Sequence, residues 1–218
     1  MKRRLNVTEA DLKRIEATLT LAEAKTSGEI VPLIVDRCHD YWWVRGFYAV
    51  VFFAVTAMII EGRNLQNPFA FTSNEILAWL SSALVAGIVL GGFHPFIRFA
   101  TPKKWLSQKV HKEVLANFTA LGLFETRDRT GVLIFISALE RRVEILADKG
   151  IFEKTGEDYW SDQVNHVVNG IHRGRLTDAL CEAIEQVGSK LTAEFPRKDD
   201  DTNEISNRVR LGRHQDSD

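Results

Sequence analysis

The sequence is poor in the features that mark several large classes of protein. Its 218 residues include only two cysteines, Cys38 and Cys181, too few for a disulfide scaffold and without a zinc-binding spacing. The 28 lysine and arginine residues are balanced by 29 aspartate and glutamate residues, so positive charge is not in excess. Because nucleic-acid binding relies on a net basic surface, we expect no nucleic-acid partner.

Motifs of known phosphate and hydrolytic chemistry are also missing. An arginine six residues after a cysteine would mark one class of phosphatase, but Val44 and Val187 occupy those positions. The sequence also lacks the DxDx[TV], GxSxG, HExxH and GxGxxG patterns and a Walker-type loop. With no recognisable catalytic motif, the sequence leaves open whether the protein is an enzyme.

The chain does contain two long apolar blocks. Residues 42–60 include a single charge, Arg45, and residues 76–97 include no formally charged side chain. Since a helix rises about 1.5 Å per residue, about 20 such residues cross the hydrocarbon core of a membrane. We therefore predict a transmembrane hairpin over residues 41–97, with one helix in each block.

Basic residues predict the orientation of this hairpin. Lysines and arginines precede the first block and follow the second, whereas the connecting residues 61–75 contain one basic residue, Arg63. Because cytoplasmic flanks carry the excess of lysine and arginine, both termini are expected in the cytoplasm. The basic residues from Arg98 to Lys112 are expected to lie against anionic lipid of the bilayer.

Small residues recur at every fourth position of the second block, at Ala83, Gly87 and Gly91. Such a face lets two helices approach closely. Two partners fit this pattern, the first helix of the same chain and a second copy of the protein. We favour packing within the chain, and a homodimer through Ala83, Gly87 and Gly91 is the alternative.

The polar remainder of the chain alternates between helical and strand patterns. Residues 8–26 have apolar side chains at helical spacing, with Thr8 and Asp11 as a capping box, and residues 29–37 are typical of a buried strand. After the hairpin the patterns predict a helix, two antiparallel strands and two further helices. The alternation in residues 142–148 indicates an edge strand, and Thr155 with Asp158 suggests another capping box.

No polar segment is long enough to form a good core alone. We therefore predict a single α/β domain built from residues 1–40 and 98–196 and interrupted by the hairpin. Residues 197–218 are highly polar, and their composition predicts a disordered tail.

Several segments resemble the TPM domain family, named after a thylakoid lumen protein, a photosystem repair factor and a nematode receptor regulator. The resemblance rests on GEIVPLIVDR, RTGVLIFISALERRVEILADKGI, GRLTDAL and a closing FP, and it covers about residues 8–196 outside the hairpin. It is closest to a bacterial membrane branch with an inserted hairpin. The resemblance implies a small-sheet α/β/α sandwich at the bacterial inner membrane. Family members have been linked to acid phosphatase activity, calcium binding and maintenance of membrane complexes.

Charged residues near the ends of the predicted strands form the candidate site. Open α/β sheets bind ligands where strands end and loops converge. The candidates for binding a ligand or partner are Arg127, Asp128, Arg129, Asp148 and Lys149. Asp36, Asp148 and Asp162 are candidate ligands for a divalent cation such as Mg²⁺ or Ca²⁺. Solvated charges and structural ion pairs explain the same residues without a ligand.

Two functions follow as hypotheses. The first is a non-enzymatic inner-membrane protein whose cytoplasmic TPM-like domain binds or maintains membrane-protein partners. The alternative is a metal-assisted phosphatase acting at the membrane surface through Asp36, Asp148, Asp162 and Arg127.

Overall fold

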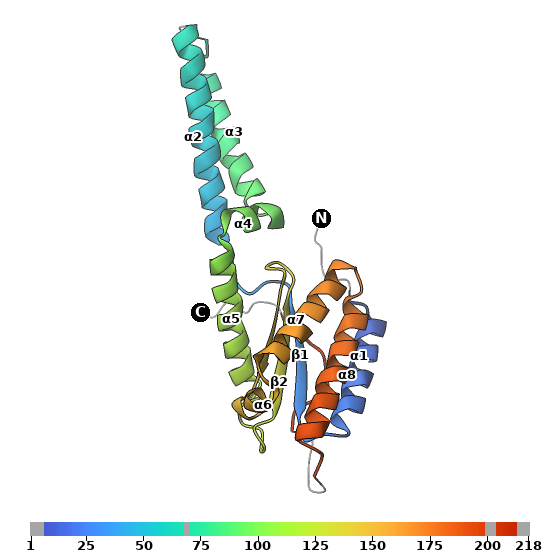
Figure 1. Ribbon diagram of the computed structural model, residues 1–218. Helices are drawn as coiled ribbons and strands as arrows, with labels where there is room; N and C mark the ends of the chain where they lie inside the picture. The colour runs from blue at the N-terminus through green and yellow to red at the C-terminus, as the bar shows by residue number, and fades with distance from the viewer. Residues whose placement is uncertain (1–6, 68–69, 199–203, 213–218) are drawn as a thin grey trace. The chain divides into compact units, whose positions relative to one another are not determined.

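The computed structural model describes residues 7–67, 70–198 and 204–212 (Figure 1). The chain divides into two compact units. An α/β unit comprises the residues up to Cys38 together with those from Ser107 onward, and a hairpin unit comprises His39–Leu106. This division follows the predicted interruption of one domain by an apolar hairpin.

A four-stranded sheet lies at the centre of the α/β unit, with strand order β3-β2-β1-β4. β1 pairs in parallel with both β2 and β4, and β2 pairs antiparallel with β3. The strands are β1 (Glu29–Val35), β2 (Gly131–Ser137), β3 (Arg142–Ala147) and β4 (Arg210–Gly212). The helices are α1 (Glu9–Glu23), α5 (Lys103–Ala120, in this unit from Ser107), α6 (Lys149–Thr155), α7 (Glu157–His172) and α8 (Leu176–Glu194).

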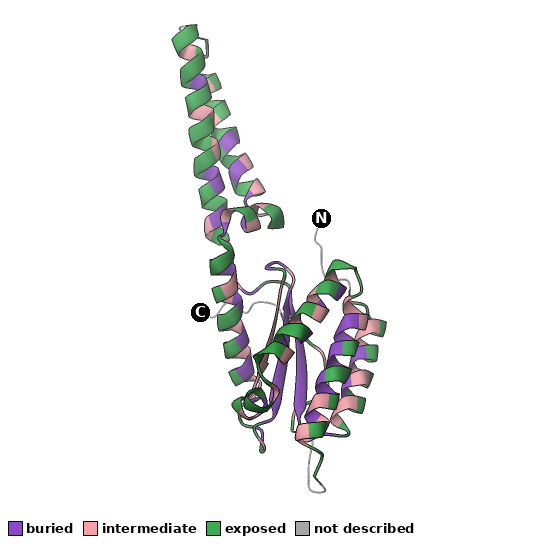
Figure 2. Cartoon of the chain, viewed as in Figure 1, coloured by how far each residue is buried: buried purple, intermediate pink, exposed green. Residues whose placement is uncertain are grey.

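Helices cover both faces of this sheet, because successive side chains of a strand point to opposite faces. Ile30 and Ile34 of β1 join the apolar cluster formed with α1, α7 and α8. The intervening Val31 and Leu33 join a second cluster with α5. Every residue of β1 and β2 is buried, which Figure 2 shows as two purple strands. The unit is thus a mixed α/β structure with a helical layer on each side.

The predicted hairpin of strands is confirmed. β3 is the outer strand of the sheet, and all of its residues are only partly buried, as its alternation predicted. Val143 and Ile145 pack towards the cluster of α1, α7 and α8, whereas Leu146 packs towards α5. On the α5 face the carboxylate of Glu144 makes a hydrogen bond with Nδ1 of His111.

The prediction of a disordered tail over residues 197–218 is wrong for residues 204–212. These residues run alongside β1 from Glu29 and end in β4, which pairs with Leu33–Val35. Ile205 and Val209 are partly buried against the two apolar clusters. A polar composition did not reveal this because so short a strand depends on backbone pairing more than on side chains. The rest of the predicted tail beyond residue 198 lies outside the described residues.

Before β4 begins, the edge of β1 on that side offers no free N–H group at Ile30 or Pro32 for pairing with another strand. The N–H of Ile30 donates to the Glu23 carboxylate at 2.8 Å rather than to a strand. Pro32, two residues further along the same edge, has no N–H to donate. β4 starts opposite Leu33, so a proline is tolerated in a buried strand because no ladder bond is required at its position.

One predicted cap is confirmed and another is wrong. Thr8 and Asp11 form the predicted capping box at the start of α1. Thr155, however, is the last residue of α6 and accepts a hydrogen bond from Trp160 Nε1 at 2.7 Å. The short helix α6, in which the chain is already helical at Thr155, was not predicted from the sequence. Gly156, with φ 78°, is the N-cap of α7.

The hairpin unit contains α2 (Trp42–Gln66), α3 (Ser73–Leu90) and α4 (His94–Ala100). The second apolar block is therefore not one helix over residues 76–97, which corrects the prediction. Gly91 ends α3, and Pro95 lies in the first turn of α4, where a missing N–H costs nothing. α2 continues past residue 60 to Gln66, because charged residues such as Glu61 and Arg63 are compatible with a helix.

The small residues of α3 lie against α2 of the same chain. A Cβ placed on Gly87 would lie 2.5 Å from the carbonyl oxygen of Tyr48, and one on Gly91 would lie 2.6 Å from Cα of Arg45. Ala83 on the same face is buried. This confirms the favoured interpretation of the pattern. A homodimer through the same face stays a prediction and would have to separate α2 from α3.

Replacing Gly87 with alanine should destabilise the hairpin unit by about 1–3 kcal/mol, because the methyl group forces two backbones apart. Gly46 on α2 has open space around its Cα, so Gly46→Ala is the matched control and should be neutral or slightly stabilising. Thermal unfolding of the full chain in detergent micelles measures both variants. Equal melting temperatures for the two variants would contradict the close packing of α2 on α3.

Candidate functional site

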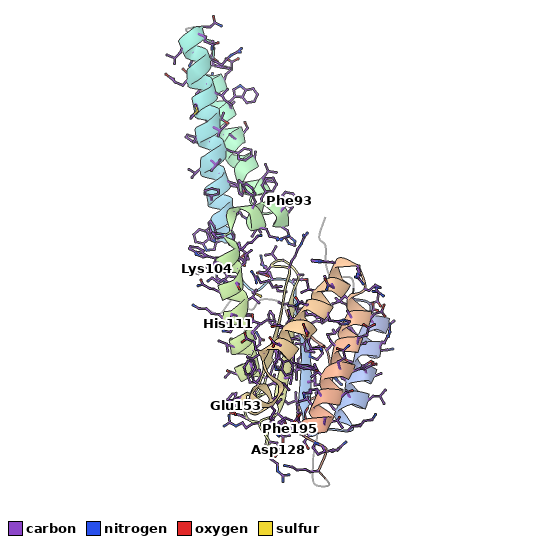
Figure 3. All side chains as sticks on the ribbon, in the orientation of Figure 1. Phe93, Lys104, His111, Asp128, Glu153 and Phe195 are labelled. Atoms are coloured by element: carbon purple, nitrogen blue, oxygen red, sulfur yellow. The ribbon has the colours of Figure 1, made fainter. Side chains whose placement is uncertain are left out.

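The predicted ligand-binding residues gather at the end of the sheet where β1 and β2 begin. Arg127, Asp128 and Arg129 form the turn before β2, while Asp148 and Lys149 follow β3. The Asp148 N–H donates to the Gly131 carbonyl at 2.9 Å. Figure 3 shows Asp128 and Glu153 of α6 at this same end of the unit.

The turn before β2 is held rigidly. The buried Thr126 hydroxyl accepts from the Thr130 N–H at 3.1 Å, and the Thr130 hydroxyl donates to the Ser27 carbonyl at 2.7 Å. Arg129 adopts a left-handed conformation with φ 56°. A side chain at Gly131 would meet the Leu123 carbonyl oxygen at 2.4 Å, so glycine is required there. These contacts fix the directions in which the charged side chains leave the turn.

Part of the charge at this end holds the structure together. Asp148 caps α6 by accepting from the Lys149 N–H, and Asp128 pairs with Lys198 Nζ at 2.7 Å. The carboxylate of Glu204 accepts from the Arg127 N–H at 3.1 Å. The structural explanation of these charges therefore applies to Asp128 and Asp148, which position α6 and the segment that leads to β4.

The remaining side chains form an exposed surface. We define the amino-end surface as Arg127, Arg129, Lys149 and Phe152, whose side chains are all exposed. Phe152 of α6 keeps 44% of its surface accessible. Lys149 also lies 3.6 Å from the Glu153 carboxylate, an exposed pair on α6. An exposed phenylalanine at the same end of the sheet as three basic side chains can contact a partner that offers both carboxylates and apolar groups.

The three aspartates proposed as metal ligands do not converge, which corrects that prediction. Asp36 follows the end of β1, where Val35 is opposite Ser137, whereas Asp148 lies beside Gly131 at the start of β2. At about 3.3 Å per residue along a strand, the two aspartates are about 20 Å apart. β1 runs parallel to β2, and β3 runs antiparallel to β2, as the sequence predicted for that hairpin. The carboxyl ends of β1 and β3 therefore lie at opposite ends of the sheet.

Asp162 joins neither of the other two aspartates. It is exposed on α7, whose buried face is formed by Trp160, Gln163 and Val167. Within the described ranges, no three His, Cys, Asp or Glu side chains are grouped so that they could hold a metal ion. A cation site made of Asp36, Asp148 and Asp162 is therefore not formed in this fold.

Sequence reasoning missed a buried carboxylate at the other end of the sheet. Glu140, in the turn between β2 and β3, is only 3% exposed and accepts from the Cys38 N–H at 3.1 Å and from the Ser137 hydroxyl. Burial and the neighbouring Glu140 raise the pKa of the Cys38 thiol, which keeps it protonated and unreactive. The adjacent Arg141 has φ 51°. The sequence showed only a charged hairpin turn here.

A second missed carboxylate lies where α1 turns into β1. Burial, together with the nearby charge of Glu29, raises the pKa of Glu23 to about 8. Glu29 is itself buried and accepts from the Glu204 N–H at 3.0 Å. Glu23 Oε2 is buried and makes no hydrogen bond to the described residues. No periodicity distinguishes Glu23 from the exposed glutamates of the chain.

Comparison with known proteins gives a fold and no family. No family model matches the chain, and no curated protein matches it. Among solved structures, it is similar to the NMR structure of the BA42 protein from the psychrophilic bacterium Bizionia argentinensis, with a TM-score of 0.59 and 19% identity. The similarity covers 95% of this chain and 96% of the BA42 chain. At that identity the two proteins share a fold, and TPM membership stays a prediction.

The raised pKa of Glu23 predicts a pH-dependent stability. Between its ordinary pKa of 4.5 and about 8, the unfolded chain carries an ionised Glu23 and the folded chain a protonated one. The stability that depends on a protonated Glu23 is therefore fully present below about pH 4.5 and is lost progressively as the pH rises towards about 8. Glu23→Gln keeps the acceptor for Ile30 and should stabilise the protein at pH 8 by about 1–2 kcal/mol, but not at pH 4.5.

Thermal unfolding of the full chain at both pH values measures this difference. Glu185→Gln is the control, because Glu185 is exposed on α8 and its replacement should change little at either pH. An effect of Glu23→Gln that is the same at pH 4.5 and pH 8 would show that Glu23 is ionised in the folded state.

Proposed function

We propose that the protein is anchored in the inner membrane of a bacterium by α2 and α3 and presents its α/β unit in the cytoplasm as a non-enzymatic binding domain for a membrane-protein partner. The observation that carries this proposal is the outward exposure of the apolar side chains of both helices. The proposed binding of a membrane-protein partner is consistent with the resemblance to TPM domains, which are linked to the maintenance of membrane complexes.

The exposure of α2 and α3 supports a membrane location over a soluble core. By length and composition both helices could span a membrane. Only 22% and 11% of their most apolar stretches are buried within the chain. A core helix of a soluble protein would be mostly buried, and apolar patches this large are unfavourable in water. Large apolar side chains that are exposed on these two helices include Val50, Met58, Ile59, Leu77, Trp79, Val85 and Val89.

The arrangement of the helices supports an orientation with both termini on one side. α2 and α3 pack along each other, so the chain returns to the side from which it left. Lysine and arginine are concentrated before α2 and after α3. The positive-inside bias therefore favours a cytoplasmic α/β unit, with the connection between α2 and α3 outside.

The amino-end surface supports partner binding by the α/β unit. Arg127 and Arg129 leave a rigid turn, and Lys149 and Phe152 are exposed on a capped helix at the same end of the sheet. Such a surface suits a partner with carboxylates around an apolar contact. We do not propose the phosphatase alternative, because its three aspartates lie apart and its mechanism required them together.

Labelling of single cysteines tests the orientation. A membrane-impermeant maleimide should react with Gln66→Cys in intact spheroplasts, and with Glu153→Cys only after lysis. Both positions are exposed, and the native Cys38 and Cys181 are buried. Labelling of Glu153→Cys in intact spheroplasts would place the α/β unit outside and contradict the proposal.

Crosslinking in native membranes tests partner binding. A photoreactive residue at Phe152 of the full chain should give a discrete adduct with a membrane protein. The double variant Arg129→Glu, Lys149→Glu should reduce its yield by about tenfold, because two charge reversals cost more than about 1.4 kcal/mol at an interface.

The matched control is Lys13→Glu, Arg173→Glu, at two exposed positions outside the amino-end surface. This control should leave the yield of the adduct unchanged. Absence of any adduct at position 152, or equal losses in the two double variants, would contradict partner binding through the amino-end surface.

A further inference from the structure

α4 is fixed across the end of the hairpin unit. The Tyr48 hydroxyl of α2 donates to the Phe96 carbonyl at 3.2 Å, and the two rings meet edge to face at 5.2 Å. Ile97 is the buried residue of α4 itself. In Figure 1 α4 runs crosswise to α2 and α3. A helix in this direction would lie parallel to the surface of a membrane that α2 and α3 cross.

Exposed aromatic side chains surround α4. Phe99 is 89% exposed, and Phe93, just before the helix, is exposed as well. Trp42, at the start of α2, and Trp105, at the start of α5, are exposed in the same unit. Aromatic residues gather at the boundary between lipid and water, where an apolar ring can be buried next to polar headgroups.

The charges at this end of the hairpin unit are mainly positive. Arg45 lies where α3 ends, and its guanidinium nitrogens are 3.4 Å from a Cβ placed on Gly92. Arg98, Lys103 and Lys104 follow within and after α4. Figure 3 shows Phe93 and Lys104 at this end. Asp40 is the acidic residue just before α2, whereas Glu61 and Glu75 lie at the opposite end of the hairpin.

We propose that α4 is an interfacial helix that binds the phosphate groups of anionic phospholipids on the cytoplasmic side of the membrane. Phe93 and Phe99 enter the boundary between headgroups and acyl chains, and the basic groups of Arg45, Arg98, Lys103 and Lys104 contact the phosphates. This inference rests on the proposed membrane anchoring and adds the lipid class that the anchor recognises.

Two observations favour lipid over a protein as the occupant of this surface. The exposed Phe93 and Phe99 follow shortly after α3, whose apolar side chains are also exposed. Beyond that surface the charge becomes basic, which is complementary to an anionic leaflet. A bilayer presents the same order of apolar chains followed by phosphate.

The depth of α4 is tested with a spin label on Phe99→Cys in the full chain, reconstituted in vesicles of phosphatidylcholine and phosphatidylglycerol at 3:1. Phe99 is exposed, so its replacement should not disturb the fold. Oxygen should relax the label more strongly than a water-soluble nickel chelate, as at the headgroup boundary. A label on Glu153→Cys should respond mainly to nickel. Equal responses at the two positions, or protection of position 99 from both reagents by protein, would overturn the inference.

The lipid preference is tested by quenching of tryptophan fluorescence with brominated lipid. In the same vesicles, bromine on phosphatidylglycerol should quench at least about twofold more, per mole, than bromine on phosphatidylcholine, because each basic residue attracts anionic lipid. Lys103→Gln, Lys104→Gln should bring the ratio close to one. The control Lys13→Gln, Lys25→Gln, on exposed positions of the α/β unit, should leave the ratio unchanged.

The outcomes separate this inference from the proposed function. Equal quenching by both brominated lipids in the unmodified protein would overturn the lipid preference while leaving the membrane anchor in place. No quenching by either lipid would overturn the anchor and the inference together. A ratio that falls equally in both double variants would assign the effect to net charge and overturn the site.

Discussion

β1 imposes the constraint on which the rest of the structure depends. The strand is buried on both faces, and its two neighbours, β2 and β4, both come from chain that follows the hairpin. An isolated β1 would expose a row of apolar side chains and unpaired backbone groups to water. The chain must therefore return from the hairpin to the place where it left. Two antiparallel helices meet this requirement, whereas a single membrane span would put β1 and its partners on opposite sides.

The same topology decides which charges can act together. Because β1 and β2 are parallel and β3 is antiparallel to β2, the carboxyl ends of β1 and β3 lie at opposite ends of the sheet. Carboxylates that seemed equivalent as residues following strands are thereby separated. The turn that carries Arg127 and Arg129 and the helix that carries Lys149 and the exposed Phe152 lie instead at one end of the sheet.

In the hairpin unit, close approach of the two helix backbones holds α2 and α3 together. Gly87 and Gly91 let α3 lie against the backbone of α2, which leaves the large apolar side chains to point outward. In water this arrangement would be unfavourable, and in a bilayer it costs little because lipid tails solvate those side chains. α3 ends at Leu90, and α4 then lies across the hairpin, held by the contacts of Tyr48 with Phe96. The glycines thus determine how closely the two long helices pack.

The sequence by itself determined the features that depend on local pattern. The buried strands, the Thr8 cap, the antiparallel strand hairpin and the apolar hairpin that interrupts one α/β unit follow from side-chain periodicity and composition, which act over a few neighbouring residues. Tertiary structure alone decided the pairing of β4 with β1, the burial of Glu140, and the separation of Asp36 from Asp148. Each of these depends on segments far apart in the chain, where backbone pairing and burial outweigh the local preference of a polar residue for water.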